Sequence, residues 1–183
     1  DLLSNLFRLI QSKPENLENE FLTRAVTRVL STADDLVDAN LKRIVLEQLL
    51  TILKVVLQNP SNPRFSHYVF ESLGLLSKYN TEGQIDIIAP SLLEILGNDV
   101  QEFVPYTFQI LAFLLEKLDN LKPLPASYSQ LIKPLLLPSV WEYRGNVPGI
   151  TRLIIAILKH DPQSTFAADQ LRLSALLGVF QRS

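Results

Sequence analysis

A serine, a histidine and a glutamate lie close together in the segment SHYVFE, as Ser66, His67 and Glu71. A serine hydroxyl activated by a histidine, with an acid that orients the imidazole, is the arrangement of a nucleophilic hydrolase. His67 and Glu71 would share one helix face, but Ser66 and His67 would point about 100° apart on a helix. We therefore expect an ordinary helical His–Glu pair. A helical enzyme with His67 in its site is the weaker alternative.

No other pattern in the sequence indicates catalysis, a cofactor or a metal site. The chain contains no cysteine, and its second histidine, His160, stands apart from the first, so we expect no transition-metal site. Glycine-rich phosphate loops and the motifs of zinc proteases and α/β-hydrolases do not occur. We expect no enzymatic activity and no cofactor.

The composition excludes two further classes of partner. The 183 residues carry a formal net charge of -2, which gives no basic field for nucleic acid or for an anionic membrane. No apolar run approaches the roughly 18 residues that span a bilayer. The first residue is not methionine and stands inside an amphipathic pattern, DLLSNLFRLI, so we expect a piece of a longer chain.

The spacing of apolar residues predicts helices along almost the whole chain. They recur at intervals of three and four, which is typical of amphipathic helices, whereas strand patterns are nearly absent. Five helix starts are indicated by capping residues or an early proline: Asn62 with Pro63, Thr81 with Gln84, Asp99 with Glu102, Ser127 with Gln130, and Asn146 with Pro148. The prediction is an all-α fold.

The helices are expected to form pairs. First helices beginning near residues 17, 63, 99 and 147 are separated by 36 to 48 residues, and HEAT-type repeats have a period of about 40–47. We predict an α-solenoid of HEAT repeats, a superhelical array of about four antiparallel helix pairs. The approximate units are 1-58, 62-97, 98-137 and 140-183, with no separate domains. Pro105 and Pro134 should kink their helices, and a single helical bundle is the alternative.

Charge is distributed unevenly along the chain. No basic residue occurs between Lys78 and Lys117, where six acidic residues fall, whereas seven basic and three acidic residues occur from Lys122 onward. Solvated helix faces would explain this. An acidic surface beside a more basic one also suits a protein partner of complementary charge.

One turn combines three residue types that are common in interface hot spots, Trp141, Tyr143 and Arg144. The tryptophan fits a core position between helix pairs better than it fits an exposed contact. Tyr143 and Arg144 are the candidates for partner contacts in this turn.

Four segments resemble the CAS-type exportins, the importin-α re-exporters of the importin-β (karyopherin) superfamily: NPSNPRFSHYVFESLG (59–74), NDVQEFVPYTFQILAFLLE (98–116), VWEYRGNVPGITRLI (140–154) and LLGVFQR (176–182). They occur in the family's order and cover most of the chain. The resemblance implies an internal segment of a longer HEAT-repeat superhelix, from its middle-to-C-terminal part. Another karyopherin or an unrelated HEAT-repeat scaffold is the alternative.

The resemblance implies binding without catalysis. The full receptor would hold importin-α together with Ran in its GTP form (RanGTP), shuttle through nuclear pores between nucleus and cytoplasm, and have nuclear pore proteins as further candidate partners. By the same analogy the second helices, at about 39–58, 82–97, 127–137 and 167–181, would face the cargo. The expected partner-binding residues are Asp86, Glu94, Gln130, Lys133, Tyr143, Arg144 and Asn146.

Overall fold

The protein was analysed as a computed structural model, which describes residues 2–13, 17–32, 37–58, 60, 62–78, 83–98, 100–118, 123–161 and 169–180. All regular secondary structure in these ranges is helical and forms ten helices, so the all-α prediction is confirmed. The chain divides into two compact units, Asp1–Tyr79 and Asn80–Ser183. The four-unit division stays a prediction.

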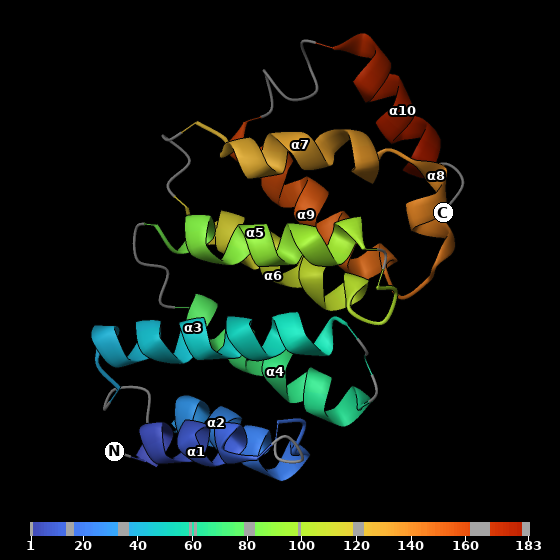
Figure 1. The fold of residues 1–183 in the computed structure, drawn as a ribbon. Helices are drawn as coiled ribbons and strands as arrows, with labels where there is room; N and C mark the ends of the chain where they lie inside the picture. Colours follow the sequence, from blue (N-terminus) through green and yellow to red (C-terminus); the bar gives the residue numbers. More distant parts are fainter. Residues whose placement is uncertain are drawn as a thin grey trace. The chain divides into compact units, whose positions relative to one another are not determined.

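The first unit contains four helices in two layers: α1 (Leu2–Ser12), α2 (Glu20–Thr32), α3 (Ala39–Val56) and α4 (Pro63–Ser77). Helices α1 and α3 form one layer, and α2 and α4 form the other (Figure 1). Helix α2 packs along α4, while α1 contacts α2 and α3 contacts α4. The core between the layers is apolar, with Leu49, Phe65 and Leu73 completely buried.

The contact between α2 and α4 contains small polar residues. The Thr27 hydroxyl lies 2.8 Å from the Ser72 hydroxyl, and both side chains are buried. Thr27 also donates to the Thr23 carbonyl, one turn back on α2, at 3.1 Å. Because the hydroxyls find partners within the interface, short polar side chains are accommodated in an otherwise apolar contact.

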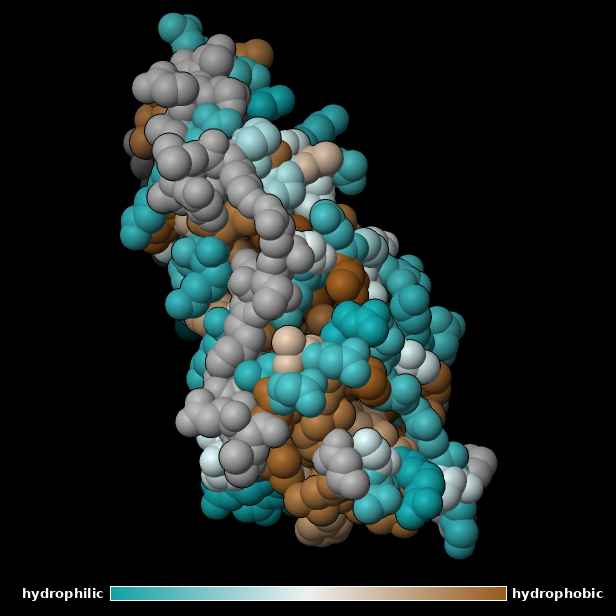
Figure 2. Space-filling model, turned by 90° about the vertical axis from the view of Figure 1, so that its left-hand side faces the viewer, coloured by the Kyte–Doolittle hydropathy of each residue, from teal (hydrophilic) through white to brown (hydrophobic). Residues whose placement is uncertain are grey.

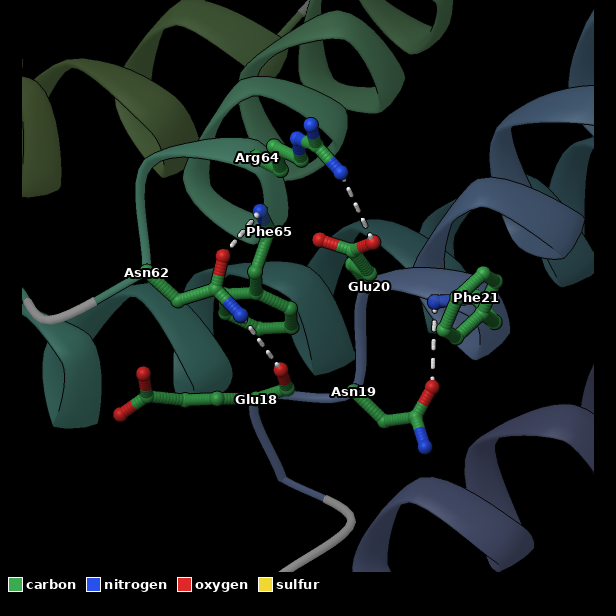
Figure 3. A network of polar contacts seen from close by, with 7 residues as sticks. All are labelled: Glu18, Asn19, Glu20, Phe21, Asn62, Arg64 and Phe65. Atoms are coloured by element: carbon green, nitrogen blue, oxygen red, sulfur yellow. Dashed lines mark hydrogen bonds and ion pairs between the residues drawn. The ribbon is translucent and has the colours of Figure 1, made fainter.

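Asn62 begins α4, as the sequence predicts, and also connects α4 to α2. Its Oδ1 accepts a hydrogen bond from the Phe65 backbone N–H at 3.1 Å, which is the bond of an N-cap. Its Nδ2 donates to the Glu18 carbonyl at 3.2 Å, just before α2 begins. Figure 3 shows both bonds, together with a 3.6 Å ion pair between Arg64 and Glu20. One amide therefore caps one helix and fixes the start of its neighbour.

Replacing Asn62 with alanine should lower the free energy of unfolding by about 1–2 kcal/mol, because α4 loses its cap and the Glu18 carbonyl loses a donor. Urea unfolding followed by circular dichroism measures this change. Asn62→Asp is the matched control, since its carboxylate still accepts from Phe65 and suits a helix N-terminus. Equal losses in the two variants would contradict the role assigned to the cap.

The second unit contains six helices: α5 (Gln84–Gly97), α6 (Val104–Lys117), α7 (Ala126–Leu135), α8 (Pro138–Glu142), α9 (Val147–His160) and α10 (Gln170–Phe180). Helices α5 and α7 lie in one layer, with α6 and α9 behind them (Figure 1). Helix α6 packs along α9, and α5 contacts both α6 and α7. Helices α2, α4, α6 and α9 correspond to the predicted first helices, and α3, α5 and α7 correspond to predicted second helices.

Helices α6 and α9 come close together at Gly149. A Cβ atom at this position would lie 2.9 Å from the Phe108 Cβ and 3.1 Å from the Pro105 carbonyl oxygen. Real Cβ atoms essentially never come within 3.0 Å of another heavy atom. Glycine fits at this crossing because it has a hydrogen in place of a side chain.

Three predicted helix starts are wrong. Helix α6 begins at Val104, after a turn at 101–103, so Glu102 does not belong to its first turn; Asp99 lies outside the described residues. Helix α7 begins at Ala126 after Pro125, and Ser127 is already helical. Helix α5 begins at Gln84 after Gly83, whose φ of 96° is left-handed, and the predicted cap Thr81 lies outside the described residues. In α5 and α7, backbone conformation at a glycine or a proline sets the boundary in place of a side-chain cap.

The helix boundaries decide whether the two predicted proline kinks, at Pro105 and Pro134, fall inside helices. Pro105 stands in the first turn of α6, where a missing N–H removes no helical hydrogen bond. The predicted kink at Pro105 is therefore wrong. Pro134 lies inside α7, as expected, and Pro90 lies inside α5. Helix α9 starts after Asn146, as predicted, although the Asn146 side chain makes no capping bond. The short helix α8 has no counterpart in the prediction.

Large apolar side chains reach the surface of both units. In the first unit these include Leu2, Leu9, Phe21 and Ile44. Figure 2 shows one face of the molecule, on which apolar patches interrupt a mostly hydrophilic surface, most clearly in its lower part. Among the described helices, none is long and apolar enough to cross a bilayer.

Candidate functional site

The Ser66–His67–Glu71 segment does not form a nucleophilic site. Ser66 is 4% exposed, and its hydroxyl donates to the Asn62 carbonyl at 3.1 Å. The His67 Nε2 lies 3.7 Å from a Glu71 carboxylate oxygen, and both side chains are about half exposed. The serine thus points into the helix contact while the histidine points outward, which confirms the expected helical pair.

No cluster that could hold a metal ion appears in the described part of the chain. No three histidine, aspartate or glutamate side chains gather closely enough there to hold a metal ion. His160 is buried at the end of α9.

Four of the predicted partner-binding residues lie on two neighbouring second helices. Asp86 and Glu94 are exposed on α5, and Gln130 and Lys133 are exposed on α7. Helices α5 and α7 contact each other in one layer (Figure 1), so these residues belong to neighbouring helices of the second unit. Two acidic residues, one basic residue and one amide give this surface a mixed charge.

The turn between α8 and α9 presents two further candidates. Tyr143 is 51% exposed, and Arg144 is exposed beside it. The buried Trp141 precedes them and donates from Nε1 to the Leu135 carbonyl at 2.8 Å. This confirms the core position that we preferred for the tryptophan. The bond fixes α8, and hence the exposed turn, against the end of α7.

Asn146 differs from the other six candidates because only 3% of it is exposed. Its Nδ2 donates to the Val140 carbonyl at 3.1 Å, which closes the turn from its other end. Its Oδ1 is buried and accepts no hydrogen bond. Asn146 therefore positions the turn in this structure, and its carbonyl oxygen is an unused acceptor.

A pocket of about 430 Å³ opens between α5, α6, α7 and α8. Its walls are mainly leucine, valine and phenylalanine side chains from the end of α5, the start of α6 and one side of α7. Its polar side chains are Gln101, Gln130, Ser139 and Asn146, and none of the described residues that line it is charged. Sequence patterns missed this pocket because it is assembled from four helices that are separate in the chain.

Sequence patterns also did not predict an ion pair that joins α6 to α9. Arg152 donates to both carboxylate oxygens of Glu116, at 2.9 and 2.7 Å. The hydrogen bond from Arg152 is the main cause of a lowered pKa of Glu116, and the same bond raises the pKa of Arg152. The guanidinium also lies 5.6 Å from the centre of the Phe113 ring. The two partners are 36 residues apart, so no local pattern connects them.

Tyr128 links α7 to α6 inside the core. It is fully buried, and its hydroxyl donates to the Leu111 carbonyl at 2.7 Å. Burial raises the pKa of the Tyr128 phenol well above its usual range, since the phenolate would lose its hydration. The neutral hydroxyl thus helps to hold α7, with Gln130 and Lys133, against α6.

Paired helices stacked in two layers, as in both units, define a helical-repeat protein. Residues 1–183 match the family described as CAS/CSE protein, C-terminus, and the chain belongs to this family.

Relatives support this assignment over nearly the whole chain. The importin alpha re-exporter of Saccharomyces cerevisiae is 42% identical over 189 residues, which cover 99% of this chain and 19% of the relative. Human Exportin-2 is 37% identical over 188 residues, which again cover 99% of this chain and 19% of the relative. The chain therefore spans about a fifth of the length of these relatives.

A solved structure gives the same result for the fold. The exportin Cse1 in its cargo-free, cytoplasmic state superposes with a TM-score of 0.86 and is 42% identical. The match covers 99% of this chain and 20% of that one. The predicted α-solenoid fold and the resemblance to CAS-type exportins are thus confirmed.

Proposed function

We propose that this chain is a segment of a nuclear export receptor that carries importin-α from the nucleus to the cytoplasm in a complex with RanGTP. The observation that carries the proposal is the 42% identity to a yeast importin alpha re-exporter over 99% of the chain. The full receptor would shuttle through nuclear pores, with nuclear pore proteins as additional partners.

The proposed role is binding without catalysis. Support comes from Ser66, whose hydroxyl is engaged with a backbone carbonyl while the neighbouring His67 points to solvent. A nucleophile and its base must lie within hydrogen-bond distance in a reactive geometry. In the proposed complex, GTP chemistry would belong to Ran.

The proposed contact surface consists of α5, α7 and the turn before α9. The exposed residues Asp86, Glu94, Gln130, Lys133, Tyr143 and Arg144 would meet the partners, and the buried Asn146 would hold the turn in place. Arg144 offers a planar group of donors beside an aromatic ring, a combination enriched at interface hot spots.

Charge reversal of Lys133 and Arg144 in the full-length receptor should weaken the complex with importin-α and RanGTP by about 1–3 kcal/mol, as for hydrogen bonds that involve a charged group. Folding should be unaffected, because both side chains are exposed. Biolayer interferometry with immobilised importin-α and saturating RanGTP measures the change.

The matched control reverses Arg24 and Arg28, which are exposed on the first helix α2. It changes the net charge equally but lies on the layer that we do not assign to the cargo. Unchanged affinity of the folded Lys133/Arg144 variant would remove both residues from the interface. An equal loss in the control would indicate a general effect of charge.

A further inference from the structure

We propose that the pocket between α5, α6, α7 and α8 is an anchor site that receives one large apolar side chain from an extended segment of the cargo protein. The proposal rests on the function proposed above and deepens it, because it assigns the central contact on that surface and the chemistry of the group that fills it.

The size and lining of the pocket indicate what fits. A pocket of about 430 Å³ with leucine, valine and phenylalanine walls and no charged lining residue among those described suits an uncharged, apolar group. Apolar pockets with a few placed polar groups are typical of ligand sites, where the apolar wall contributes most of the affinity and the polar groups fix the orientation. A leucine, isoleucine or phenylalanine side chain matches these properties.

The polar groups indicate that the occupant includes a peptide backbone. Gln101, Gln130, Ser139 and Asn146 line the pocket and are all neutral. Gln130 and Ser139 are exposed, so their side chains can pair with the backbone N–H and C=O groups of a bound extended segment.

The position of the pocket indicates that this segment belongs to the cargo. Gln130 lines the pocket and also belongs to the exposed surface that we assign to the partners. Glu94 directly follows the lining residue Leu93 on α5, and Lys133 directly precedes the lining residue Pro134 on α7. The pocket is thus continuous with the mixed-charge surface. A buried apolar anchor within a polar rim is the usual architecture of a protein–protein hot spot.

Two tryptophan variants of the full-length receptor test the proposal. Ser139 is exposed and lines the pocket, so Ser139→Trp should fill the pocket with its indole ring without removing a core side chain. Ser31→Trp is the matched control, because Ser31 is exposed on α2, outside the proposed contact surface, and does not line the pocket. The affinity for importin-α is measured with saturating RanGTP, and circular dichroism checks that each variant is folded.

We expect Ser139→Trp to weaken cargo binding at least tenfold, the scale of losing one hot-spot contact, and Ser31→Trp to bind within twofold of the wild type. Wild-type affinity of folded Ser139→Trp would overturn the anchor site and leave the proposed function intact. An equal loss in both variants would also overturn it. No binding by the wild-type receptor would overturn the proposed function itself, and the anchor site with it.

Photo-crosslinking keeps the proposal testable if Ser139→Trp does not fold. Benzoylphenylalanine is placed at the exposed Gln130, and the crosslinked peptides are identified by mass spectrometry. A crosslink to one importin-α segment at or next to a large apolar residue supports the anchor site. Crosslinks to Ran, to another part of the receptor or to a second receptor copy would overturn the assignment to the cargo, and so would the absence of a cargo crosslink.

Discussion

Replacing Leu73 with alanine should lower the free energy of unfolding by about 2–5 kcal/mol, the range for large-to-small substitutions in a packed core. Leu73 is completely buried in the first unit, so the change removes apolar contacts and leaves a cavity. Urea unfolding of the 183-residue chain, followed by circular dichroism, gives the difference in free energy.

His67→Ala is the control in the same helix. The His67–Glu71 pair is about half exposed on both sides, and such surface pairs contribute about 0–1 kcal/mol. The histidine variant should therefore unfold close to the wild type. If His67→Ala were the more damaging change, the packing of α4 would be assigned to the wrong face.

Replacing Gly149 with alanine should lower the free energy of unfolding by about 1–3 kcal/mol, the cost of overpacking a core. A methyl group there would meet the Phe108 Cβ at 2.9 Å and the Pro105 carbonyl at 3.1 Å. Neither atom is the end of a flexible side chain, so relief requires that α6 and α9 move apart.

Gly74→Ala is the matched control and should change stability in the opposite direction. Gly74 lies inside α4, and a Cβ there would have no heavy atom within 4 Å. Alanine at such a site should raise the free energy of unfolding by about 0.5–1 kcal/mol, because glycine costs backbone entropy in a helix. The same denaturant titration serves both variants. Stabilisation by Gly149→Ala would contradict the close approach of α6 and α9.

The helical fold could be predicted because most of its signals are local. Asn62 followed by Pro63 specifies a cap and a first-turn proline within a few residues, and α4 begins there. The starts of α5, α6 and α7 could not be predicted in the same way. Polar residues at capping-box spacing also occur in loops and inside helices, as Ser127 does inside α7, and spacing alone does not distinguish these cases.

The candidate surface could be predicted only in part. The exposure of Lys133 and Arg144 follows from their charge and position in the pattern, and the structure confirms it. The burial of Asn146 could not be predicted, because it depends on the Val140 carbonyl in a short helix that has no clear sequence signal. The Glu116–Arg152 pair and the pocket each depend on helices that meet only in the folded chain.

The unequal packing of the second unit gives it a directional mechanical response. Where α6 crosses α9, the backbone and Cβ atoms around Gly149 are already at contact distance, and such dense packing resists compression. Between α5 and α7, the pocket of about 430 Å³ leaves room for displacement. Phe108 belongs to both places, since its Cβ faces Gly149 and the residue lines the pocket. A load that displaces α5 from α7 would therefore change the width of the pocket, while the α6–α9 crossing beside it keeps its spacing.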